Sequence, residues 1–150
     1  MSTTHIEIPA EVRSAGRRAG YAIAVMVNLV LLIIVQNILE WGWLPFLTEE
    51  FSDVVPWISF SLVTSIVVNL VYQANDTPGV KSIGQIVTNL ISIFVTYQFL
   101  RVFPFDFSNY DFNWGIVARI VLILTIVGAG IGVLTEAVKL TSAEFDSERR

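Results

Sequence analysis

Few side chains in this 150-residue chain could carry out acid–base, nucleophilic or metal chemistry. Cysteine is absent, which excludes disulfides, thiolate nucleophiles and thiolate metal sites. The one histidine, His5, lies in a polar N-terminal segment, so a serine nucleophile elsewhere lacks a base and the apolar segments hold no histidine ligand for a haem. We therefore expect no catalytic residue, no cofactor and no metal site, and the sequence favours an enzyme least.

The polar residues that remain lie inside long apolar segments and recur at helical spacing. Grouped by apolar segment, and together with two glycines of a GxxxG pattern, these residues are Asn28 and Gln36; Ser61, Ser65 and Asn69; Gln85, Asn89, Ser92 and Thr96; and Thr125, Gly128 and Gly132. Such stripes let helices approach closely and hydrogen-bond in lipid, at about 0.6–2 kcal/mol per bond. The alternative is a pore lined by the amides and hydroxyls, and the spacing does not separate these two interpretations.

Four apolar segments position these residues, at 21–39, 54–72, 83–100 and 114–134. Each approaches the roughly 20 residues that a helix needs to cross the hydrocarbon layer. Charged residues make up 15% of the chain, whereas a soluble domain has about a quarter. Because backbone groups in lipid must be satisfied within the segment, helices are favoured. The sequence predicts an all-α membrane protein with a four-transmembrane-helix bundle over residues 21–137.

The ends of the chain are polar. Residues 1–20 are expected to form a cytoplasmic segment that could include an interfacial amphipathic helix, and residues 138–150 a polar cytoplasmic tail. A cleaved signal peptide is the alternative interpretation of the N-terminal part, since arginines precede the first apolar segment. That segment is longer than the 7–15 residues typical of a signal peptide, and no small-residue cleavage site follows. We expect a retained helix.

Cationic residues are distributed unequally between the two sides of the predicted bundle. Seven lie on the side of the termini, at Arg13, Arg17, Arg18, Lys81, Lys139, Arg149 and Arg150, and the opposite loops contain one, Arg101. Lysine and arginine favour the cytoplasmic side of a membrane. Both termini are therefore expected in the cytoplasm, and the short loops favour the plasma membrane.

The two outer loops, 40–53 and 101–113, combine aromatic, proline and acidic residues. Tryptophan and tyrosine favour the boundary between apolar and wet surroundings, so an aromatic belt with helix caps explains this composition. The alternative is a docking surface along the outer face of the membrane. The candidates for that surface are Trp41, Trp43, Phe46, Trp57, Phe105 and Trp114.

Two charged residues fall within or beside the fourth apolar segment. Arg119 lies near its outer end, where the side chain either extends to the membrane surface or pairs with a carboxylate such as Glu40. Glu136 precedes Lys139 by three residues, the spacing of an ordinary helix surface pair.

Two similar stretches, 27–46 and 88–105, each read Asn-Leu and end in Pro-Phe, and they are consistent with a duplicated helical hairpin. The expected function is that of a binding, structural or accessory subunit of a membrane complex. Its expected partners are the lipid bilayer and another membrane protein or further copies of the chain, and no nucleic acid. The alternative is a homo-oligomeric channel or facilitator for a small ion or solute.

Overall fold

The computed structural model describes residues 10–148, with the side chains of residues 11–142, so His5 lies outside the described residues. In chain order the elements are α1 (Ala10–Trp41), the 3₁₀ helix η1 (Glu49–Asp53), α2 (Val55–Ala74), α3 (Pro78–Val102) and α4 (Trp114–Glu148). The four α-helices are each long and apolar enough to span a membrane. The prediction of an all-helical chain with four such helices is confirmed.

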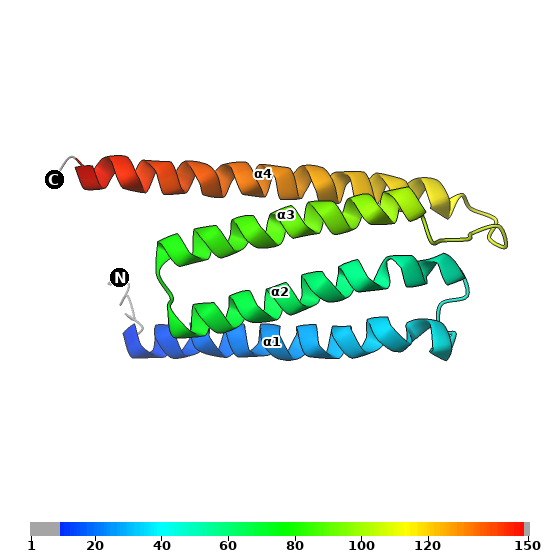
Figure 1. Ribbon diagram of the computed structural model, residues 1–150, viewed down its shortest axis with the longest axis horizontal. Helices are drawn as coiled ribbons and strands as arrows, with labels where there is room; N and C mark the ends of the chain where they lie inside the picture. The colour runs from blue at the N-terminus through cyan, green and yellow to red at the C-terminus, as the bar shows by residue number, and fades with distance from the viewer. Residues whose placement is uncertain (1–9, 149–150) are drawn as a thin grey trace, which may run out of the picture.

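The four helices lie in chain order, one beside the next, as an open row (Figure 1). Helix α1 packs on α2, α2 on α3 and α3 on α4, with the closest association inside the pairs α1–α2 and α3–α4. Within residues 10–148, no close backbone approach joins α1 to α4. The bundle is therefore two helical hairpins held together along the α2–α3 seam, and α1 and α4 form its edges.

Two of the helices extend well beyond the apolar segments that predict them. Residues 10–20 form the first turns of α1 and not a separate helix, and residues 138–148 continue α4. Neither extension contains a proline; residues 10–20 include three alanines and three arginines, and residues 138–148 include a lysine, a leucine, an alanine and two glutamates, all residues that favour a helix. Hydropathy marks the part of a helix that can lie in lipid, whereas the helix itself ends where the backbone is interrupted.

Recognisable local signals begin and end the shorter helices. Proline stands in the first turn of both α2 and α3, where its missing N–H costs no hydrogen bond. The side-chain oxygen of Asn113 accepts from the backbone N–H of Ile116 at 3.3 Å and caps the start of α4. Helix α3 ends at Val102, and its C-cap residue Phe103 has a φ of 46°, in the left-handed region that usually requires glycine.

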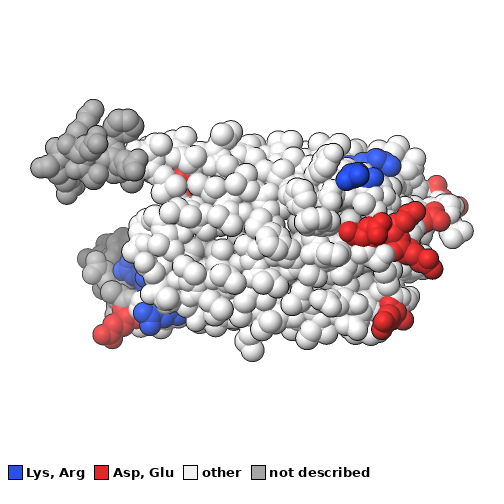
Figure 2. Space-filling view, viewed as in Figure 1, with Lys and Arg blue, Asp and Glu red and all other residues white. Residues whose placement is uncertain are grey.

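The two ends of the row differ in character. The aromatic end consists of residues 40–54 and 101–119, and the terminal end consists of the start of α1, residues 72–85 and the last turns of α4 (Figure 1). Charged side chains gather toward both ends of the face shown in Figure 2, and a broad uncharged belt separates them. Fully buried side chains, Val54 and Pro104, lie at the aromatic end.

Backbone hydrogen bonds join the two loops of the aromatic end. The N–H of Thr48 donates to the carbonyl of Pro104 at 3.1 Å, and the N–H of Asp106 donates to the carbonyl of Phe46 at 2.8 Å. An isolated antiparallel bridge pairs Leu47 with Phe105. These contacts connect the two hairpins at this end, so the loops form one packed unit.

Candidate functional sites

A cluster of ionic and hydrogen-bonding groups at the terminal end is centred on Asp76. Its carboxylate accepts from Arg17 Nε at 2.6 Å and from the Tyr21 hydroxyl at 2.6 Å, and it pairs with Lys81 Nζ at 2.5 Å. Hydrogen bonds from Lys81, Tyr21 and Arg17 hold the pKa of Asp76 well below the ordinary aspartate value. The carboxylate thus ties α1 to the 75–77 turn and to α3.

A second carboxylate continues this cluster toward α4. Glu136 accepts from the Ser82 hydroxyl at 2.7 Å and from Lys139 Nζ at 2.6 Å. The predicted pairing of Glu136 with Lys139 is confirmed. Ser82 is buried, with 7% of its surface exposed, so its hydroxyl is satisfied by the glutamate of the neighbouring helix.

An open cavity of about 440 Å³ lies within the terminal end. All four helices line it, through Tyr21, Tyr72, Lys81, Ser82, Glu136 and Lys139 among others. The Tyr72 hydroxyl donates to the Lys81 carbonyl at 3.0 Å, which holds the ring between α2 and α3. Sequence reasoning missed this cluster because its donors lie 55 and 59 residues from Asp76 along the chain. The available signal was an aspartate in a turn beside cationic residues.

Three of the polar groups in the predicted stripes donate hydrogen bonds to carbonyls of their own helices. Asn28 Nδ2 donates to the Ala24 carbonyl at 2.7 Å, and Asn69 Nδ2 donates to the Ser65 carbonyl at 2.8 Å. The Thr125 hydroxyl donates to the carbonyl four residues earlier at 2.9 Å. Such local bonds satisfy a polar group in lipid without a neighbouring helix.

The remaining stripe residues occupy varied positions. A Cβ atom added at Gly132 would lie 2.5 Å from Asn89 Nδ2, so this glycine allows α3 and α4 to approach, whereas Gly128 has open space around its Cα. Gln85 Nε2 donates to Asn89 Oδ1 at 3.4 Å. Thr96 is buried; Ser61, Ser65 and Ser92 are half-buried; Gln36, Gln85, Thr125 and Gly128 are exposed.

Arg119 has a different partner from the one that the sequence suggested. Its guanidinium lies over the ring of Phe103, with 3.9 Å between the central carbon and the ring centroid, in a cation–π contact. The described ion pairs do not include one between Arg119 and Glu40. The reason is the open row, since Glu40 ends α1 and Arg119 lies on α4, at opposite edges of the molecule.

The aromatic residues in and beside the loops 40–53 and 101–113 form several separate contacts. Phe46 and Phe105 come together, with ring centroids 6.4 Å apart, and join the two loops. Three tryptophan contacts are Trp41 with Trp43 at 4.5 Å, Trp57 with Phe94 at 4.9 Å and Trp114 with Phe112 at 5.2 Å. Only the Phe46–Phe105 contact among these connects the two loops.

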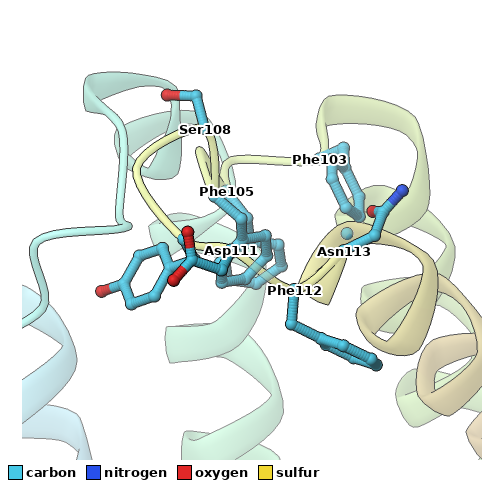
Figure 3. A pocket seen from close by; sticks show the side chains of 9 residues that line it. Phe103, Phe105, Ser108, Asp111, Phe112 and Asn113 are labelled. Atoms are coloured by element: carbon cyan, nitrogen blue, oxygen red, sulfur yellow. The ribbon is translucent and has the colours of Figure 1, made fainter.

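The loop 103–113 borders a second open cavity, of about 430 Å³ (Figure 3). Five of its nine lining residues are aromatic: Phe103, Phe105, Phe107, Tyr110 and Phe112. Figure 3 shows Phe103 and Asn113 beside the start of α4, and Ser108 at the outer rim. The backbone N–H of Ser108 donates to Asp106 Oδ1 at 2.9 Å, which lowers the pKa of that carboxyl group.

The fold and these sites define a class of protein: an all-helical chain with four potential membrane-spanning helices. No group of three histidine, cysteine, aspartate or glutamate side chains that could hold a metal ion occurs in the part of the chain described. No family model, curated protein or solved structure shows significant similarity to this chain. The function must therefore be argued from the geometry alone.

Proposed function

We propose that this chain is a non-catalytic subunit of a membrane complex, which acts by binding another membrane protein. The observation that carries the proposal is the open row of helices, because within residues 10–148 no close approach of α1 to α4 closes the row around a central path. Its edges instead offer long apolar surfaces: Met26 on α1 and Leu134 on α4 have 67% and 68% of their surface exposed. A subunit that binds through its edge helices needs this arrangement.

The distribution of charge supports an orientation within the plasma membrane. Arg13, Arg17, Arg18, Lys81 and Lys139 belong to the terminal end, and Arg101 and Arg119 belong to the aromatic end. Since cationic residues favour the cytoplasmic side, we propose that both termini lie in the cytoplasm and that the aromatic end faces outward.

The alternative of a homo-oligomeric channel is less well supported. A pore lining must offer polar groups that exchange hydrogen bonds with the permeating ion or with water. The amides of Asn28 and Asn69 and the hydroxyl of Thr125 already donate to carbonyls of their own helices. These groups are compatible with helices that face lipid or a partner, so we favour the binding subunit.

The test is to identify what contacts α4 in the native membrane. A photo-crosslinking amino acid at Leu134 is expected to give an adduct with a single partner protein at a fixed molar ratio to this chain, because this exposed side chain lies on an edge helix. The matched control is the same amino acid at Ile86, half-buried on α3, which should give none. Native mass spectrometry of the extracted protein should then show a stoichiometric complex.

Two outcomes would contradict the proposal. A monomer that carries only lipid, with no protein adduct at Leu134, would remove the partner. A complex made only of copies of this chain that carries ions across liposome membranes would replace the binding subunit with the channel.

A further inference from the structure

The aromatic cavity of loop 103–113 has a chemically one-sided lining. Its residues supply five aromatic rings, the Asp111 carboxylate, the Asn113 amide and the Ser108 hydroxyl, and no lysine or arginine. The cavity of about 430 Å³ falls within the roughly 300–1,000 Å³ of small-molecule sites. Aromatic faces carry negative partial charge, so this lining is suited to a positively charged ligand.

The rings are held in place although they belong to a loop. Phe105 stacks on Phe107 with centroids 5.9 Å apart and contacts Phe103 edge-on at 5.5 Å. Phe107 in turn contacts Tyr110 at 6.1 Å. Backbone hydrogen bonds from this loop to residues 46 and 48 fix its position against the other hairpin. A prearranged site loses little entropy when a ligand binds.

One cation already binds this ring cluster. The guanidinium of Arg119 occupies a face of Phe103 at 3.9 Å. The electrostatic potential around the cavity also favours cations, because carboxylates outnumber guanidiniums at the aromatic end. The six carboxylates are Glu40, Glu49, Glu50, Asp53, Asp106 and Asp111, and the two guanidiniums are those of Arg101 and Arg119. A diffusing cation is therefore attracted toward this end of the molecule.

We propose that the cavity binds the ammonium group of a small organic cation, either a free alkylammonium compound or an amine-bearing lipid headgroup. Rings of the lining would contact the alkyl part of such a group on one side, and the Asp111 carboxylate would balance its charge. A hard metal cation is a poor fit, because it requires six or more oxygen ligands and the lining offers a single carboxylate. An anion would meet this carboxylate and the ring faces, and no lysine or arginine is among the lining residues.

The test uses the full chain purified in a mild detergent and radiolabelled choline in equilibrium dialysis. Choline is expected to bind at one site per chain, and its uncharged isostere 3,3-dimethylbutan-1-ol is expected to compete at least about tenfold more weakly, because only the cation interacts with the ring faces. Equal competition by the two compounds would overturn the proposal, since it would show a cavity selected by shape alone. Absence of choline binding would overturn it as well.

Variants locate the binding within this cavity. Asp111→Asn and Tyr110→Leu are each expected to weaken choline binding about fivefold or more, and both residues are exposed enough that the fold should tolerate the change. The matched control is Asp53→Asn, which removes a carboxylate of the same end outside the cavity and should leave binding unchanged. Equal effects of Asp53→Asn and Asp111→Asn would show general attraction by charge and would contradict the assigned site.

The source of the cation is resolved with nanodiscs of stated composition. If a lipid headgroup occupies the cavity, phosphatidylcholine discs will reduce the binding of free choline relative to phosphatidylglycerol discs, and Tyr110→Leu will remove the difference. If the ligand is soluble, free choline will bind equally in both. Failure to bind choline in phosphatidylglycerol discs would overturn the proposal in either form. The cavity lies at the start of α4, whereas the crosslinking position Leu134 lies in the half of α4 toward the terminal end, so these results do not depend on the proposed partner.

Discussion

The seam between the two hairpins depends on Gly84, and replacing it with alanine should destabilise the bundle. Gly84 is buried on α3, where the Tyr72 ring of α2 crosses it. An added Cβ would overlap the Tyr72 hydroxyl and lie 2.9 Å from two carbons of the ring. The ring cannot easily turn aside, because its hydroxyl donates to the Lys81 carbonyl and its face contacts Tyr21 at 5.4 Å.

The expected size of the effect follows from three contributions. Forced overpacking costs about 1–3 kcal/mol, and loss of the hydrogen bond from Tyr72 to the Lys81 carbonyl costs about 0.5–1.5 kcal/mol. Alanine in place of glycine within a helix contributes about 0.5–1 kcal/mol in the opposite direction. Together these ranges give about 0.5–4 kcal/mol, so Gly84→Ala should lower the free energy of unfolding by about 2 kcal/mol. Gly130→Ala, where nothing lies within 4 Å of the added atom, should leave it unchanged or raise it by about 0.5–1 kcal/mol.

The assay is reversible unfolding in mixed micelles with increasing SDS, followed by tryptophan fluorescence. In a Tyr72→Phe background the closest overlap is gone, so Gly84→Ala should cost less there than in the natural sequence. If Gly84→Ala is as stable as Gly130→Ala, the close packing of α2 on α3 does not exist in the folded protein. The account of two hairpins joined at this seam would then be wrong.

Three further predictions concern orientation, helix contact and charge. In this cysteine-free chain, Glu49→Cys should react with an impermeant maleimide outside intact cells and Thr77→Cys should not; the opposite labelling would invert the topology. Gly132→Ile should lower the free energy of unfolding in SDS by about 1–3 kcal/mol, because the new side chain would clash with α3. Gly128→Ile should leave it unchanged, since Gly128 has open space around it. Equal effects of the two substitutions would contradict these different surroundings. Because the pKa of Asp76 is lowered in the folded protein, its contribution to stability is complete above the ordinary aspartate pKa and is lost as the pH falls below it. Asp76→Asn should thus lower the unfolding midpoint at pH 7 and reduce the loss on acidification, and an unchanged midpoint would show that the cluster does not hold α1.

The sequence was sufficient for the elements that depend on local composition. Long apolar segments predict the four helices, and prolines mark the starts of α2 and α3. The i,i+3 spacing predicts the pair of Glu136 with Lys139. Each of these features is determined by residues within a few turns of one another, so no knowledge of the packing is needed.

Features that depend on the order of the helices in space were not accessible in the same way. The pairing of Arg119 with Glu40 presumes a closed bundle, whereas the open row places the two residues on opposite edges. The Arg119 guanidinium contacts the ring of Phe103 instead. The Asp76 cluster joins residues of α1 to a turn more than fifty positions away. The aromatic cavity depends on how loop 103–113 folds back, and aromatic composition alone does not distinguish a cavity from a membrane belt.

The two hairpins also indicate where a partner would bind. Phe46 and Phe105 end similar stretches of sequence and meet at the aromatic end, and the pairs α1–α2 and α3–α4 are the two closest associations in the row. In a closed arrangement of two repeated hairpins, α4 would pack on α1 as α2 packs on α3. That fourth contact does not occur within residues 10–148, so the surfaces that would form it are the ones left exposed on α1 and α4. A partner helix at either edge would complete the packing, which is why the crosslinking experiment places its probe at Leu134.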